Sequence, residues 1–539
     1  MNSSTLSERV AILLCDFLAS LQKADGTRDL TEGVLKNALL SYPEFQWDAY
    51  DDAECNASTI FGMVKLYRFF MESLSFSEKS KMLKIVLSNL WATLVSSYPA
   101  NYQVEAVRCI FDLRIYFDVH EVEAGISYML LHTPERIRLH SFYRLWSLSQ
   151  DINESESLLS NPLFVVLDSL RDSKLESSID VQKFVFNVCT DGSANRFLKI
   201  VTSPLLSFSI VQKEKTMVEP QDDFKLFAYY LDTILNLLRR NEKFVKESLS
   251  HEFVSSENAE KFELFTSNEW EISNYKTLLL NIIQKFLKLR FPEDITDPSC
   301  CIANFTTCIS KALELYSFLI TGSETDFVNH FYLLVDSCSY YVSDSGIKSV
   351  ELEPIESMFI KHIGEFLDMA KSMNANVVRF QKDDKSGSPS FLTFINRGIS
   401  KCASPTLLEK WFSLMKSSLY LLDNSIFGEM LNFNQTIIER IDSCFSFIKR
   451  FERLENCCDT ESFLSICLSG LEDLLTITHS YLVTPTLSPA NKAKQGENGF
   501  FGNVISGVFQ IESPLVKSEE EQRVYSVIIA FQDANKNSI

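Results

Sequence analysis

The sequence predicts an all-α protein that forms an α-solenoid of stacked helices. Three observations lead to this prediction: apolar residues recur with a helical period, capping residues and prolines fall between these segments, and glycine is scarce. The 539 residues include only 16 glycines but 42 phenylalanines. Few glycines mean few sharp turns, which disfavours strand-rich folds. One hydrophobic core rarely grows beyond roughly 250–300 residues, so we expect several domains or a repeat array.

The helical period is clear between Met82 and Val95, where apolar residues recur at i, i+4 and i+8. Leu226, Tyr230 and Ile234 form another such row, with a second apolar row beside it. Each stripe covers roughly 100° or more of its helix, as expected when neighbours cover a helix on several sides. Stacked helices of an irregular HEAT or armadillo type bury their faces in this way, although no short repeat signature is visible.

Prolines and caps mark the expected ends of helices. Proline lacks the N–H that a helix interior requires. We therefore expect five prolines to lie between helices: Pro43, Pro99, Pro134, Pro162 and Pro292. Ser404 and Pro405 read as an N-cap and a first helical position.

Two apolar runs could be strands on composition alone. Leu163–Leu167 lies in a helical context and is predicted to be helical, whereas Val524–Phe531 (VYSVIIAF) is left open.

Polar stretches divide the chain into five parts. Lys213–Asp223, Gln381–Ser390 and Thr484–Gly499 lack a hydrophobic period and are rich in turn formers. We therefore expect an N-terminal helical array over 1–212, a central array over 224–380 and a C-terminal array over 391–483. A disordered linker over 484–499 and an apolar C-terminal segment over 500–539 are expected to follow.

The charge balance argues against a nucleic-acid partner. Lys and Arg number 51 against 71 Asp and Glu, which gives a formal net charge of −20. Phosphate neutralisation by a basic stripe supplies most nucleic-acid affinity, and the sequence has no such stripe. The same acidity disfavours a broad grip on anionic lipid, but leaves room for a local basic patch formed by the fold.

Cysteine usage and apolar run lengths indicate the compartment. The 13 cysteines are irregularly spaced, with no CxxC, and most lie in apolar helical stretches. We expect a reduced cytoplasmic protein rather than a disulfide framework. No apolar run approaches the 18 residues needed to span a bilayer, so membrane association is expected to be peripheral.

No pattern of catalytic, cofactor-binding or metal-ligating residues emerges. The sequence lacks HExxH, zinc-type His and Cys spacing, a phosphate-binding GxxxxGK[ST], a dinucleotide-type GxGxxG and a GxSxG elbow. His132 and His140 could share a helical face only if Pro134 did not end the helix, and we expect that it does. The prediction is a non-enzymatic protein without a cofactor or metal site.

One apolar segment is a candidate contact site for a membrane or a partner. Gly499–Phe509 follows the polar linker and, as a helix, would place six apolar residues in two adjacent rows: Phe500, Phe501, Val504, Ile505, Val508 and Phe509. Such a helix could insert shallowly into lipid or dock in a groove. The alternative is a helix that packs back onto the array, since apolar stripes are usually core. The absence of Lys and Arg opposite the stripe weakens the lipid interpretation.

Several stretches, taken in order, resemble the Dopey family of eukaryotic trafficking proteins. They are Tyr102–Arg108 (YQVEAVR), Arg138–Leu148 (RLHSFYRLWSL), Pro162–Leu170 (PLFVVLDSL), Phe224–Leu238, Gly499–Phe509 and Arg523–Ala534. Family members are several times longer, and their conserved amino-terminal block is missing here. We therefore expect this chain to be a fragment or a truncated gene product.

The resemblance implies a peripheral membrane scaffold that acts in protein transport between endosomes and the Golgi. It implies a large scaffold related to Arf exchange factors as partner and, in some organisms, an aminophospholipid flippase. It carries over no catalytic residues. Two other hypotheses stay open: a generic HEAT-like adaptor in another multiprotein complex, and an enzyme with a deep polar pocket that no motif reveals.

Overall fold

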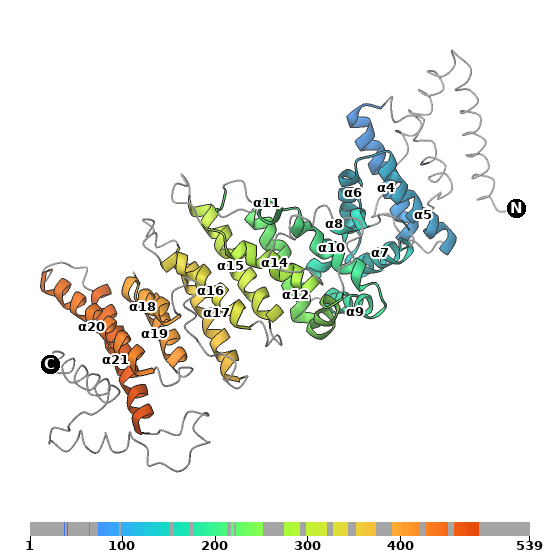
Figure 1. The fold of residues 1–539 in the computed structure, drawn as a ribbon. Coiled ribbons are helices and arrows are strands. Elements are labelled where there is room, and N and C mark those ends of the chain that lie inside the picture. The colour runs from blue at the N-terminus through green and yellow to red at the C-terminus, as the bar shows by residue number, and fades with distance from the viewer. Residues whose placement is uncertain are drawn as a thin grey trace, which may run out of the picture. The chain divides into compact units, whose positions relative to one another are not determined.

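The computed structural model describes residues 74–483 with gaps, together with Asn37, Leu40 and Val64. The gaps are 96–98, 151, 153–155, 173–175, 213–216, 220–222, 252–273, 291–297, 321–326, 343–351, 373–390, 403, 420–425 and 451–457. Within these residues all regular secondary structure is helical (Figure 1). The one β-type pairing among them is an isolated bridge between Met217 and Arg290.

The helices are bounded as follows. In the first half of the chain they are α4 (Phe76–Val95), α5 (Ala100–Asp112), η3 (Leu113–Ile115), α6 (Val119–His132), α7 (Glu135–Leu148), α8 (Glu156–Leu167), η4 (Asp168–Leu170), α9 (Glu176–Thr190), α10 (Ala194–Leu206), α11 (Ser209–Gln212) and α12 (Phe224–Leu249). In the second half they are α14 (Tyr275–Leu287), α15 (Pro298–Ile320), α16 (Phe327–Val342), α17 (Glu353–Ser372), α18 (Phe391–Lys401), α19 (Pro405–Leu419), α20 (Ile426–Arg450) and α21 (Cys458–Val483).

Local sequence explains several helix ends. Pro99 and Pro134 stand directly before α5 and α7, as predicted. The Ser404 hydroxyl accepts the N–H of Leu407 at 3.2 Å, which confirms the predicted N-cap of α19. Gly192, in the turn between α9 and α10, has a φ of 81°, a left-handed conformation that glycine adopts without steric cost.

Pro162 contradicts the prediction that it lies between helices, because it sits inside α8. Its ring crowds the preceding turn, and it has no N–H for the carbonyl four residues earlier. The N–H of Asn161, directly before the proline, donates to Glu123 Oε1 of α6 at 2.8 Å. A carboxylate from the neighbouring helix thus supplies an acceptor at the distorted turn, and Leu163–Leu167 is helical as expected.

The chain divides into two compact units: Met1–Glu214 with Tyr229–Ile282, and Lys215–Ala228 with Ile283–Ile539. In the first unit α4, α6, α8 and α10 pack in succession and form one layer of helices. Helices α5, α7 and α9 form a second layer, joined to the first by pairs such as α4 with α5 and α9 with α10. Alternate helices therefore stack on each other.

The second unit repeats this alternation. Helices α15, α17, α19 and α21 pack in one succession, and α16, α18 and α20 in another. Each helix of the second series contacts the helix that follows it in the chain. This two-layer stacking of helix pairs is the arrangement of an α-solenoid, so the predicted fold class is confirmed.

Aromatic residues fill much of both cores. In the first unit the ring of Phe184 packs edge-on against Phe142 and Trp146, with ring centroids about 6 Å apart. In the second unit the rings of Phe224, Phe286 and Phe305 all contact one another, with centroids 5.2–6.2 Å apart. The division into five parts stays a prediction, because much of the linker sequence on which it rests lies outside the described residues.

Candidate functional site

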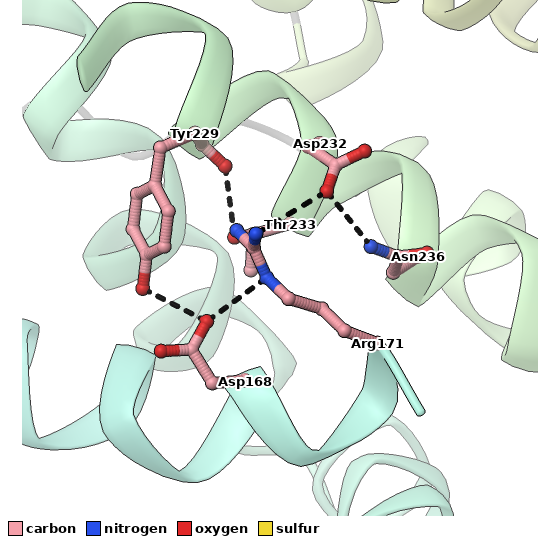
Figure 2. A network of polar contacts seen from close by, with 6 residues as sticks. All are labelled: Asp168, Arg171, Tyr229, Asp232, Thr233 and Asn236. Atoms are coloured by element: carbon pink, nitrogen blue, oxygen red, sulfur yellow. Dashed lines mark hydrogen bonds and ion pairs between the residues drawn. The ribbon is translucent and has the colours of Figure 1, made fainter. Parts of the chain in front are cut away.

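A network of polar side chains in the first unit joins η4 to α12 (Figure 2). Asp168 begins η4 directly after α8, and Arg171 follows its last residue. Tyr229, Asp232, Thr233 and Asn236 are spaced i, i+3, i+4 and i+7 on α12, which places them on one side of that helix. The two elements are about sixty residues apart in the chain and meet through these side chains.

Arg171 lies at the centre of this network. Its Nε lies 3.1 Å from Asp168 Oδ1, and its Nη1 lies 3.6 Å from Asp232 Oδ2. Its guanidinium carbon is 4.6 Å from the ring centroid of Tyr229, within the range of a cation–π contact. The Tyr229 hydroxyl donates to Asp168 Oδ1 at 3.1 Å, which closes the network (Figure 2).

The electrostatics of the network favour a fixed arrangement over proton transfer. Burial raises the pKa of Asp168, although the Arg171 charge and the Tyr229 hydroxyl partly oppose the shift. Burial and the nearby Asp168 carboxylate raise the pKa of Tyr229 far above its usual value, so its hydroxyl stays a proton donor at neutral pH. The arrangement can hold two helical elements together, and it contains no activated nucleophile.

Two of the sequence blocks singled out above meet here. Pro162–Leu170 contributes Asp168, and Phe224–Leu238 contributes the residues of α12. The blocks also share an apolar contact, because the ring of Phe164 lies edge-on to Tyr230 with centroids 4.8 Å apart. These blocks are therefore the two sides of one helix–helix contact.

Another of these blocks, Arg138–Leu148, supplies arginines that bind the C-terminal ends of other helices. Arg138 donates to the carbonyls of Leu130, Leu131 and Thr133 at the end of α6, at 2.9–3.3 Å. Arg144 Nη1 donates to Leu94 O at 2.7 Å at the end of α4. The terminal carbonyls of a helix lack intrahelical hydrogen-bond donors and carry partial negative charge. A guanidinium supplies the donors and offsets that charge.

The same use of arginine recurs in both units. Arg196 donates to Trp146 O at 3.0 Å near the end of α7, and its guanidinium lies 4.4 Å from the Trp146 ring. In the second unit Arg440 Nη2 donates to Cys402 O at 2.7 Å, just beyond the end of α18. Sequence reasoning missed these roles because the acceptors are backbone atoms about 40–50 residues away in the chain.

One cluster in the second unit contains the residue types of a nucleophilic triad without its geometry. Ser317 Oγ and Glu365 Oε2 both approach His362 Nδ1, at 3.2 and 2.9 Å. A working triad places the acid and the nucleophile on opposite ring nitrogens. Burial also lowers the pKa of His362, despite the adjacent Glu365. The cluster therefore links α15 to α17 rather than activating the serine.

Two acidic residues of α17 bind side chains of α19. Glu353 accepts hydrogen bonds from Ser404 and Thr406 at the start of α19. Glu356 accepts the indole N–H of the buried Trp411 at 2.9 Å. Burial raises the pKa of Glu356 to about 7, and the Trp411 N–H partly opposes this shift. The carboxyl is therefore the group in this contact that titrates near neutral pH.

The described residues contain neither a metal-binding group of side chains nor a membrane-spanning helix. Among the described residues, no three His, Cys, Asp or Glu side chains are grouped so that they could hold a metal ion. No helix of the described ranges is both long and apolar enough to cross a bilayer. His132 ends α6 and His140 lies in α7, so Pro134 separates them as predicted.

The six residues of the candidate contact segment lie outside the described residues. Phe500, Phe501, Val504, Ile505, Val508 and Phe509 therefore stay a prediction, as does the open assignment of Val524–Phe531.

Comparisons with known proteins point to one family. A family model described as "DOP1B-like, TPR repeats" matches residues 13–194, which include α4 to α9. Protein DOP1 of Saccharomyces cerevisiae is 24% identical over 473 residues, which cover 87% of this chain. Protein dop1 of Emericella nidulans is 21% identical over an alignment that covers 99% of it. The matched parts amount to 26% and 32% of those two proteins, so this chain spans about a third or less of their length.

Proposed function

Because this chain belongs to the Dopey family, we propose that it is a non-catalytic peripheral membrane scaffold in vesicle-mediated protein transport between endosomes and the Golgi. It acts through protein–protein contacts. Its partners are a large scaffold related to Arf exchange factors and, in some organisms, an aminophospholipid flippase. Its location is cytoplasmic, on the outer surface of Golgi and endosome membranes.

The observation that carries this proposal is the two-layer stack of helices with its arginine and carboxylate contacts. A stack of helix pairs presents long faces to partners without requiring a pocket. The polar side chains described above are engaged in holding one helix to another, as Arg144 does for α4 and Arg440 for α18. A scaffold needs such fixed faces, whereas catalysis needs groups that are free to react.

The proposal is tested by the location of the tagged, full-length protein in cells of its source organism. We expect puncta that coincide with Golgi and endosome markers and that disperse when the large scaffold partner is depleted. A uniform cytoplasmic distribution would contradict the trafficking role. Stable association with a complex of another pathway would favour the generic helical adaptor instead.

A further inference from the structure

The first turns of α4 carry an exposed aromatic side chain beside a group of lysines. Phe76 is 78% exposed, more than any other large apolar side chain in the described part of the chain. Lys81 and Lys84 are exposed, and Lys79 is half-buried. At about 100° per residue, Lys81 and Lys84 lie on the same exposed side of the helix as Phe76. The half-buried Lys79 lies on the opposite side, between the buried Met82 and Leu83. We call Phe76–Lys84 the α4 basic segment.

The lysine charges of this segment are not neutralised by a described acidic side chain. The one acid within it, Glu78, accepts the backbone N–H and the hydroxyl of Ser75 at 2.9 and 2.8 Å, as in a capping box. The side-chain ammonium groups of the three lysines form no hydrogen bond or ion pair with any residue that the structure describes. The segment therefore presents a local positive charge in a chain whose net charge is −20.

The geometry points to an anionic lipid surface as the ligand of the α4 basic segment, and we propose that the segment is a peripheral membrane contact. A protruding aromatic ring reaches the headgroup boundary, while Lys81 and Lys84 beside it bind anionic headgroups. Lys79 extends its ammonium group to the same surface on its long apolar stem. Beyond about 8 Å the remaining acidic surface is screened at physiological salt, so a local patch can act despite the net charge.

Lipid fits the segment better than a structured acidic partner does. Lysine is a strongly hydrated point charge on a flexible stem, suited to headgroups that have no fixed pattern. Fixed recognition of carboxylate or phosphate favours the planar fork of arginine, which this chain uses on helix ends. This inference rests on the proposed peripheral membrane role and assigns one lipid contact to it.

The test measures binding of the full chain to sedimented vesicles. The vesicles are phosphatidylcholine alone or phosphatidylcholine with about one third phosphatidylserine. Replacing each of Lys79, Lys81 and Lys84 by Gln should lower the partition coefficient onto the anionic vesicles roughly fivefold. For the triple variant we therefore expect a loss of about a hundredfold. Phe76→Ser is expected to reduce partition about tenfold. Neither variant should change thermal stability by more than about 0.5 kcal/mol, because Phe76, Lys81 and Lys84 are exposed and Gln retains part of the stem of the half-buried Lys79.

A charge-matched control separates local from general electrostatics. Replacing the exposed Lys183, Lys225 and Lys243 by Gln changes the net charge equally and should leave partition within about threefold of the wild type. Equal losses in both triple variants, or no binding of the wild-type chain to the phosphatidylserine vesicles, would overturn the inference.

A second readout separates this inference from the proposed function. The triple variant at Lys79, Lys81 and Lys84 should still purify with the large scaffold partner. If it binds vesicles normally but loses that partner, the segment is a protein contact and the lipid inference is wrong. If the wild-type chain never recovers the partner, the proposed function fails, whatever the vesicles report.

Discussion

The contact between Glu123 and Asn161 offers a sharp test of how the helix stack accommodates Pro162. Glu123 is only 5% exposed, and its Oε1 accepts the Asn161 N–H at 2.8 Å. Removal of the carboxylate by Glu123→Ala deletes a charge-assisted hydrogen bond, a loss of roughly 1.5–3 kcal/mol. Glu123→Gln keeps an oxygen acceptor at the same place and should cost only about 1 kcal/mol.

The assay is peptide-level hydrogen exchange, because it reports the local stability of α8 separately from that of the second unit. A loss of 1.4 kcal/mol in local stability raises the opening equilibrium tenfold. We therefore expect amides of α8 to exchange about ten- to a hundredfold faster in Glu123→Ala and less than about tenfold faster in Glu123→Gln. Amides of α17 to α19, in the other unit, should be unchanged.

Glu121 provides the matched control, because it lies on the same helix and its side chain is exposed. Glu121→Ala should alter exchange in α8 by less than about threefold. The reasoning would be refuted if Glu123→Ala exchanged no faster than this control. It would also be refuted if Gln and Ala at position 123 behaved alike, since the acceptor oxygen would then be irrelevant.

Three further predictions concern the helix contacts. The raised pKa of Glu356 means that its contribution to stability is present below about pH 4.5 and is lost as the pH rises through about 7. Glu356→Gln should flatten the pH profile of thermal unfolding over that range; parallel profiles would contradict this. A Cβ at Gly398 would lie 2.3 Å from the Trp411 ring. Gly398→Ala should therefore destabilise α18 by about 1–3 kcal/mol in denaturant unfolding. An unchanged unfolding midpoint would contradict the close packing of α18 against Trp411. Arg144→Lys retains the charge but loses the planar fork, so exchange at the end of α4 should rise about tenfold, and wild-type rates there would rule out the capping role.

The helical class was predictable because its signals are local. Apolar stripes at helical spacing, as in Met82–Val95, report how a segment meets its neighbours without reference to distant residues. The cap at Ser404 was predictable for the same reason, because its acceptor and donor lie three residues apart. Leu163–Leu167 required context, since five apolar residues fit a strand or a helix equally well.

The contacts between distant residues were not predictable from one sequence. Pro162 was expected to end a helix, and the error arose because the acceptor that accompanies it, Glu123, is 38 residues away. Arg171 gives no local sign that it joins Asp168 to Asp232. The blocks that resemble the Dopey family were recognisable as sequence, but their role as opposite sides of a helix contact required the fold.

The central claim, a scaffold that works through partners in endosome–Golgi transport, is tested most directly by purifying the tagged endogenous protein and identifying what accompanies it by mass spectrometry. The account predicts recovery of the large scaffold related to Arf exchange factors, with or without a flippase. Recovery of a stable complex from another pathway, without that large partner, would contradict the trafficking role. Only the conclusion that this chain is a helical scaffold would then stand.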